Sequence, residues 1–117
     1  MNRRQIGTEY EEQAADFLRK KGCKVVEKNY RCRAGEVDLI VRDGKYLVFV
    51  EVKYRHNERA GNPLEAVNRT KQRRISKTAV WYLQSRGLSM EEPCRFDVVG
   101  ICRDQTVWVK DAFPFAG

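Results

Sequence analysis

The segment "GEVDLIVRDGKYLVFVEVKYR", residues 35–55, carries the strongest fold signal in the chain because it is rich in Val, Leu, Ile and Phe. It predicts two strands, 36–42 and 45–54, joined by a turn at Asp43-Gly44, a dipeptide favoured where both turn residues need a positive φ. The nearly continuous apolar run up to Glu51 indicates an inner strand that is covered on both faces. Four charged residues nevertheless interrupt these strands: Glu36, Asp38, Glu51 and Lys53. Charged groups in such strands are costly unless they are paired or bind a metal ion.

The expected hairpin geometry indicates what these charges can do. With Asp43-Gly44 as the turn, Asp38 faces Phe49, and Glu51 is the diagonal neighbour of Asp38, roughly 7–8 Å away at Cα. Two carboxylates and water suit Mg²⁺ (or Mn²⁺), which accepts phosphate oxygens and activates a bound water. Lys53 lies two positions after Glu51, on the same face, where it can orient that water or balance the phosphate charge. The pattern predicts phosphodiester hydrolysis by Asp38, Glu51 and Lys53.

A structural alternative is an ordinary salt bridge between a carboxylate and Lys53 on an exposed sheet face, which contributes little stability. That alternative suits a strand in which polar and apolar residues alternate. The apolar run before Glu51 does not alternate, so the functional interpretation is favoured. Glu36, in contrast, is expected to be peripheral.

The rest of the chain predicts a mixed α/β sheet of about five strands flanked by helices, within a single domain of residues 1–117. Periodicity and stop signals at Gly22 and Gly87 predict helices at 8–21 and 64–86, the second with a break near 68–70. Further strands are expected at 23–30, 94–102 and 106–113, a basic loop at 31–35 and a polar loop at 55–63.

Composition narrows the class of protein. Charged residues make up 33% of the chain and its longest apolar run is residues 46–50, which excludes a disordered chain and a membrane-spanning one. The N-terminal residues lack the apolar segment of a secretory signal, so we expect a cytoplasmic protein with four reduced cysteines. One histidine and no Cys-x-x-Cys pair exclude a typical zinc site. The net charge of +7 indicates an anionic partner, most often nucleic acid.

The segment "NRTKQRRISK", residues 68–77, concentrates this positive charge. On a helix, an apolar stripe through Ile75 and Ala79 would be buried, and the cations on the other face would contact phosphates without reading sequence. Alternatively, this is only a solvated helix face. The candidate nucleic-acid-binding residues are Arg33, Arg55, Lys71, Arg73, Arg74 and Lys77.

Longer stretches of the sequence resemble a known family. "GEVDLI", "LVFVEVKYR", "EAV…K..RI" and "RFDVV", in this order, resemble the YraN-like family of small bacterial proteins, over residues 7–101. Asp38 followed by Glu51-Val52-Lys53 resembles the Asp…Glu-x-Lys signature of restriction-endonuclease-like nucleases, and the YraN-like family is similar to archaeal Holliday-junction resolvases. The resemblance implies a restriction-endonuclease-like fold and DNA, including branched DNA, as the substrate. A junction-cutting enzyme is expected to be a homodimer, since it must nick two strands symmetrically.

The resemblance also implies two further metal ligands, the backbone carbonyl of Val52 and the carboxylate of Glu11. Thr8-x-x-Glu11 is equally a capping box that starts the first helix by satisfying two backbone amides, and both roles stay open for Glu11. The chain departs from the family pattern at Tyr10, where glycine is usual, and from the nuclease signature at Val37, where proline is usual. Proline supplies no catalytic group, so the second departure leaves the expected chemistry intact.

Two functions from different classes therefore remain. The first is a metal-dependent endonuclease, and the alternative is a nucleic-acid-binding module of the same fold that does not cleave. The presence of Asp38, Glu51 and Lys53 together favours the enzyme, since a binding module has no evident need for all three.

Overall fold

The computed structural model describes residues 3–55, 67–103 and 105–117. Its elements are α1 (Arg3–Lys20), β1 (Lys24–Cys32), β2 (Gly35–Asp43), β3 (Tyr46–Arg55), α2 (Arg69–Ser85), β4 (Cys94–Cys102) and β5 (Gln105–Val109). The sheet has the strand order β1-β2-β3-β4-β5, and its pairs are antiparallel except for the parallel pair β3–β4. The predicted fold class is confirmed: this is a mixed five-stranded α/β sheet of the restriction-endonuclease-like type.

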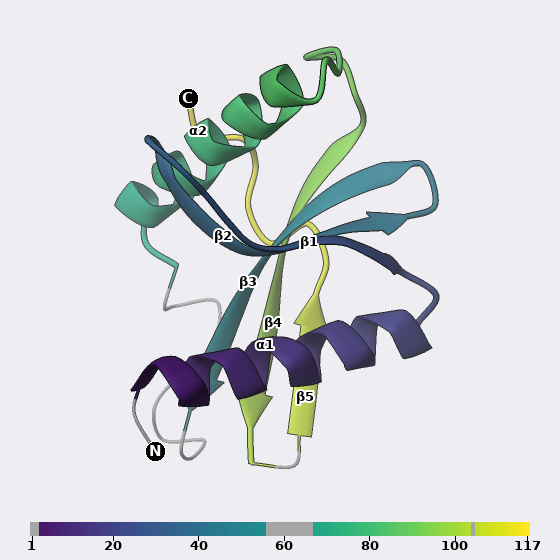
Figure 1. Ribbon diagram of the computed structural model, residues 1–117, viewed down its shortest axis with the longest axis vertical. Coiled ribbons are helices and arrows are strands. Elements are labelled where there is room, and N and C mark those ends of the chain that lie inside the picture. Colours follow the sequence, from purple (N-terminus) through teal and green to yellow (C-terminus); the bar gives the residue numbers. More distant parts are fainter. Residues whose placement is uncertain (1–2, 56–66, 104) are drawn as a thin grey trace.

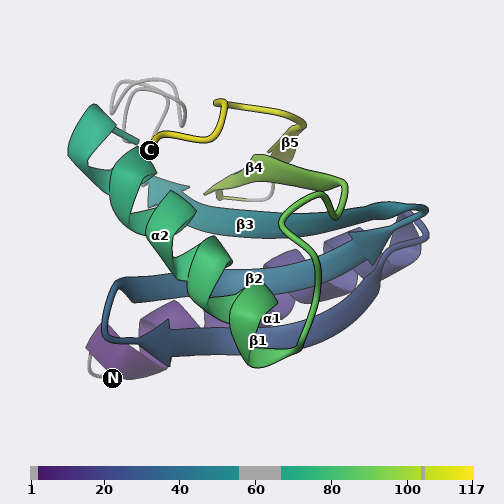
Figure 2. The ribbon, with the colours of Figure 1, turned by 90° about the horizontal axis from the view of Figure 1, so that it is seen from above.

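The two helices cover opposite faces of the sheet, with β3 at its centre (Figures 1 and 2). The α1 face buries Ala14, Ala15 and Leu18 against one set of strand side chains, and the α2 face buries Ile75, Ala79, Tyr82 and Leu83 against the other. Consecutive residues of β3 alternate between these two cores, as expected for an inner strand. The predicted burial of β3 on both faces is therefore confirmed, and any charged side chain on β3 must enter a covered layer.

Both helices end as the sequence predicts. After α1, Cys23 N–H donates to the Leu18 carbonyl and Gly22 N–H to the Arg19 carbonyl, which is a Schellman motif. Leu88 and Gly87 repeat this pattern after α2. Within the described residues, neither helix combines the length and apolarity needed to cross a membrane.

The helix starts differ from the sequence-based expectation. The first helix begins at Arg3, so Thr8 lies inside it and the capping-box interpretation of Thr8-x-x-Glu11 is wrong. Residues 3–6 are compatible with a helix, and Gly7 alone costs only about 1 kcal/mol, so the helix continues through them. Helix α2 begins at Arg69 because Asn68 is its N-cap and accepts a hydrogen bond from Lys71 N–H, at the position of the break expected near 68–70; the expected start at residue 64 lies outside the described residues. Residues 56–66, which include most of the expected polar loop, lie outside the described residues.

The hairpin turn between β2 and β3 is also displaced by one residue. Asp43 pairs with Tyr46, so the turn is Gly44-Lys45, and Gly44 has the positive φ of 59° that a type II′ turn needs at its first position. Asp43 stays in the strand, where Arg95 binds its carboxylate at 2.8 Å. The pairing therefore shifts by two residues. An even shift keeps every side chain on its predicted face but gives it a different partner.

Two other boundaries differ. Strand β1 extends through Arg31 and Cys32, which reduces the expected basic loop to a turn at residues 33–34. Strand β5 ends at Val109, four residues early, because Asp111 adopts a φ of 52°. The next residue, Ala112, then donates its N–H to the Phe96 carbonyl of β4 at 2.7 Å.

Within the "RFDVV" stretch, the Asp97 carboxylate and the Arg95 guanidinium form an ion pair that is mostly buried. Asp97 is fully buried and accepts two hydrogen bonds of 2.9 Å from Arg95, one from Trp108 Nε1 and one from Asp111 N–H. The hydrogen bonds to Asp97 raise the pKa of Arg95, so its guanidinium stays charged. Because every oxygen of Asp97 is satisfied, this cluster holds β4, β5 and the C-terminal segment together and offers no open position for a ligand.

Candidate active site

The side chains of Asp38, Glu51 and Lys53 lie close together where β2 and β3 separate. The last ladder pair is Leu39–Val50, and beyond it the backbone N–H of Val52 donates to Oδ2 of Asp38, with a distance of 2.7 Å between the two atoms. Continuing the same register places Asp38 opposite Glu51. The side chains of Asp38 and Glu51 lie within hydrogen-bonding reach of each other. The expectation that Asp38 faces Phe49 is wrong, because Phe49 pairs with Ile40.

A local irregularity turns Asp38 toward β3. Val37 packs into the α2-side core and Leu39 into the α1-side core, although residues two apart in a regular strand share a face. The residue of β1 opposite Asp38 is Asn29, which has a φ of 51°. Asparagine tolerates this left-handed conformation better than most residues. We did not predict this bend, and an asparagine in the middle of a strand was its only sequence signal.

Glu51 is the most deeply buried member of the site. It is 6% exposed, and its Oε1 lies 3.1 Å from Lys71 Nζ and 3.8 Å from Lys53 Nζ. Lys53 comes from β3, as predicted, whereas Lys71 reaches in from the first turn of α2. The sequence suggested Lys71 only as a phosphate contact, so its position on Glu51 is new. A buried carboxylate without such partners would be strongly destabilising.

Burial and crowding shift the ionisation of this cluster. Burial, followed by the charge of Glu51 and a hydrogen bond with it, raises the pKa of Asp38 from 3.8 to about 8. Burial, followed by contact with Lys71, lowers the pKa of Lys53 from 10.5 to about 8. Burial also disfavours the charged form of Lys71, but its contacts with Lys53 and Glu51 outweigh that effect and raise its pKa. In this environment the Asp38 carboxyl retains its proton at neutral pH.

The oxygen donors present suit a hard divalent cation. The N–H and C=O groups of one residue in a strand point to the same side, and Val52 N–H reaches Asp38, so the Val52 carbonyl faces the same gap. Two carboxylates and a carbonyl are the donor types that Mg²⁺ and Mn²⁺ prefer. Across the described ranges, no three His, Cys, Asp or Glu side chains form a group that could hold a metal ion. A metal site at this gap stays a prediction, and its ligands would be Asp38, Glu51 and the Val52 carbonyl.

Glu11 approaches this gap from α1. Burial raises the pKa of Glu11, a hydrogen bond with Asn29 opposes that shift, and the charge of Glu51 adds to it. The preceding residue, Tyr10, stacks on Tyr54 of β3 with 3.9 Å between ring centroids, which holds this turn of α1 over the end of the strand. Glu11 is thus within electrostatic reach of the carboxylates, and its role as a metal ligand stays a prediction.

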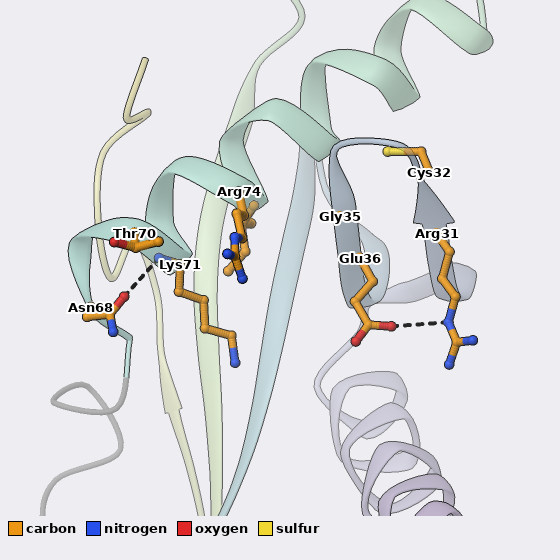
Figure 3. Close-up of a pocket in the computed structure, with 9 residues that line it drawn as sticks. Arg31, Cys32, Gly35, Glu36, Asn68, Thr70, Lys71 and Arg74 are labelled. Atoms are coloured by element: carbon orange, nitrogen blue, oxygen red, sulfur yellow. Dashed lines mark hydrogen bonds and ion pairs between the residues drawn. The ribbon is translucent and has the colours of Figure 1, made fainter.

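A pocket of about 790 Å³ adjoins the site, between the turn that joins β1 to β2 and the first turns of α2 (Figure 3). Lys71 and Arg74 reach toward it from α2, and Arg31 and Glu36 face them from the hairpin, joined by an ion pair of 3.1 Å. The lining residues are Arg31, Cys32, Gly35, Glu36, Asn68, Thr70, Lys71, Arg74 and Ile75. Glu36 is exposed and bound to Arg31, so its expected peripheral role agrees with its position.

The other predicted nucleic-acid-binding residues differ in their position relative to this pocket. Arg73, Arg74 and Lys77 are exposed on α2, as expected, but only Arg74 among them lines the pocket. Arg33 is exposed in the turn between β1 and β2. Arg55 is the last residue of β3, and its side chain lies outside the described part of the structure.

Comparison with known proteins places the chain in a family. The model of "Uncharacterised protein family UPF0102" matches residues 10–101. A UPF0102 protein of Lachnoclostridium phytofermentans is 45% identical over 117 residues, covering 100% of this chain and 99% of the relative. Those of Geotalea uraniireducens and Nitrosococcus oceani are 47% and 41% identical, covering 95% and 94% of this chain and 91% and 92% of their own lengths. The relatives' names state no activity. The chain therefore belongs to the UPF0102 family, which confirms the resemblance to YraN-like proteins.

Proposed function

We propose that this protein is a metal-dependent phosphodiesterase that cleaves nucleic acid. The observation that carries the proposal is the juxtaposition of the Asp38 and Glu51 carboxylates in a mostly buried gap of the sheet, with Lys53 and Lys71 beside them. Such a cluster reduces stability as long as no cation joins the carboxylates. Proteins retain costly, strongly shifted ionisable groups mainly at functional sites.

Each residue has a distinct role in this proposal. Asp38, Glu51 and the Val52 carbonyl would hold Mg²⁺ or Mn²⁺, with Glu11 as a candidate further ligand. A bound cation supplies charge stabilisation at the phosphate and an activated water. The Val52 N–H fixes the orientation of the Asp38 carboxylate, and Lys53, whose pKa is about 8, can hold or release a proton near neutral pH. Lys53 would orient the attacking water or balance charge on the phosphate.

The positive charge of the chain supports nucleic acid as the substrate class. The net charge is +7, and exposed cations on α2 continue from the pocket that adjoins the carboxylates. Phosphate contacts of this kind give affinity without sequence preference. We propose DNA, including branched DNA such as a Holliday junction, with a homodimer as the unit that acts on a junction.

The rival function uses only part of these residues. A nucleic-acid-binding module would need the exposed cations of α2, which do not depend on Asp38 or Glu51. Binding and cleavage can therefore be separated by substitution.

The experiment compares Asp38→Asn and Glu51→Gln with the wild type and with Asp16→Asn, an exposed carboxylate on α1 that serves as a control. Both site variants should retain DNA binding but lose Mg²⁺- or Mn²⁺-dependent cleavage and the rise in melting temperature that metal produces. Lys53→Ala should lose cleavage while still binding metal, because an ammonium is not a ligand. Cleavage that survives in Asp38→Asn and Glu51→Gln would contradict the proposed site.

A further inference from the structure

Lys71 belongs to two neighbouring environments. Its Nζ lies 3.1 Å from Glu51 Oε1, and its side chain also lines the pocket between α2 and the β1–β2 hairpin (Figure 3). Among the residues that the structure describes, it is the one that both contacts a carboxylate of the candidate site and lines this pocket. A ligand in the pocket would therefore lie next to the group that holds Glu51.

The pocket itself favours an anion. Three cationic side chains, Arg31, Lys71 and Arg74, and one carboxylate, Glu36, line it. The ion pair between Arg31 and Glu36 balances two of these charges, which leaves the positive charge on the α2 side. Thr70 and Asn68 add polar groups on the same side. This arrangement suits a phosphate group that enters between the helix and the hairpin.

The backbone of Lys71 is fixed while its side chain is long and half-buried. Its N–H donates to Asn68 Oδ1 at 2.9 Å, and Gln72 N–H and Nε2 bind the carbonyls of Asn68 and Val67. Lysine carries a compact charge on a flexible four-carbon stem, so its ammonium can exchange one anion for another without a backbone movement. The helix start thus anchors the residue, and the side chain is free to change partners.

We propose that Lys71 is a positioning residue with two alternative anionic partners. In the free protein it holds the Glu51 carboxylate, and when a divalent cation takes that place it binds a phosphate of the nucleic-acid strand in the adjoining pocket. The inference rests on the proposed function. It explains why a lysine of the basic helix reaches into the carboxylate cluster instead of pointing to solvent.

One substitution should then act in opposite directions on two ligands. Lys71→Gln removes the cation that competes for Glu51, so we expect Mn²⁺ to bind roughly two- to fivefold more tightly, the range for a partly exposed ion pair. The same change removes a charged hydrogen-bond donor from the pocket. A bound phosphate should therefore bind about tenfold more weakly.

The test uses calorimetry with two probes, Mn²⁺ alone and thymidine 3′,5′-bisphosphate in the presence of Mn²⁺, which has phosphates but no phosphodiester to cleave. Lys71→Arg should resemble the wild type, because it keeps the charge at both positions. Lys20→Gln, which makes the same chemical change at the exposed end of α1, should alter neither affinity. In EDTA the loss of bisphosphate affinity in Lys71→Gln should shrink, because Lys71 then remains on Glu51.

The outcomes separate this inference from the proposed function. A wild-type protein that binds no Mn²⁺ would overturn the proposed metal site. The proposed exchange of Lys71 between Glu51 and a phosphate would then be overturned as well. If the wild type binds Mn²⁺ and Lys71→Gln binds it equally well or more weakly, the proposed role of Lys71 would be overturned. The proposed metal site would not be affected by that result. An unchanged bisphosphate affinity in Lys71→Gln would show that the pocket is not where its ammonium meets a phosphate.

Discussion

Replacing Asp38 by asparagine should stabilise the metal-free protein at neutral pH. The carboxylate is crowded by Glu51, and burial together with that neighbour raises the pKa of Asp38 from 3.8 to about 8. Asparagine has the same shape, keeps an oxygen that can accept the Val52 N–H, and carries no charge. A substitution in a buried polar site usually destabilises, so a gain in stability would be distinctive.

The raised pKa of Asp38 determines how the free energy of unfolding changes with pH. Below pH 3.8, Asp38 is protonated in both the folded and the unfolded chain, so its pKa shift has no influence on stability. As the pH rises from about 4 toward 8, the unfolded chain releases this proton and the folded chain retains it, so the folded state loses stability. At 1.36 kcal/mol per pKa unit, the loss that follows from the shift of Asp38 approaches about 5 kcal/mol at pH 7.5. The charged form of Lys53 adds a nearly constant contribution in this window, because its lowered pKa is about 8.

Thermal unfolding in EDTA at pH 4.0 and pH 7.5 measures this effect. We expect Asp38→Asn to be more stable than the wild type by about 2–4 kcal/mol at pH 7.5, or about 10 °C in melting temperature, and by less than about 1 kcal/mol at pH 4.0. Saturating Mn²⁺ should cancel the advantage by stabilising only the wild type. An Asp38→Asn variant that is less stable at pH 7.5 would show that the carboxylate is ionised and well paired, which would refute the reasoning.

Three other predictions test separate parts of the structure. Asp97→Asn should lower the free energy of unfolding by about 3 kcal/mol in a urea titration, because it removes a fully buried carboxylate from the mostly buried Arg95 guanidinium, which keeps its ion pair with Asp43; unchanged stability would contradict this. Reversing Arg73 and Arg74 to Glu should weaken duplex binding and flatten its salt dependence, and an identical titration would reduce α2 to a solvated face. On four-way-junction DNA, sedimentation should show two chains per junction, whereas a strictly monomeric complex would remove junction resolution.

The sequence predicted the central strand and the face that carries its charged residues because both depend on local pattern. The apolar run before Glu51 indicated a strand that is buried on both faces. Glu51 and Lys53 are two positions apart, which places their side chains on the same face of that strand. The pairing of β2 with β3 could not be predicted as reliably, because Gly44 is compatible with either turn position. Asp43 joins the strand because it binds Arg95, a residue 52 positions later in the chain.

The parts of the site that the sequence did not predict are those that depend on distant contacts. Lys71 looked like one of several cations on a basic helix, and only the packing of α2 on the sheet brings its ammonium to Glu51. The bend at Asp38 depends on Asn29 in the neighbouring strand. The start of α1 was mispredicted for a different reason. Thr8 and Glu11 fit a capping box, but the residues that precede Thr8 can also be helical, and the helix begins at Arg3.

The most direct test of the central claim is whether the wild-type protein cleaves nucleic acid. Supercoiled, single-stranded and four-way-junction DNA would each be incubated with the full chain in Mg²⁺, in Mn²⁺ and in EDTA, with Glu51→Gln prepared in parallel to exclude a contaminating nuclease. We predict metal-dependent cleavage of at least one substrate by the wild type, none in EDTA and none by Glu51→Gln. Binding of all three DNAs without cleavage in either metal, together with no calorimetric metal binding, would contradict the nuclease and favour the binding module.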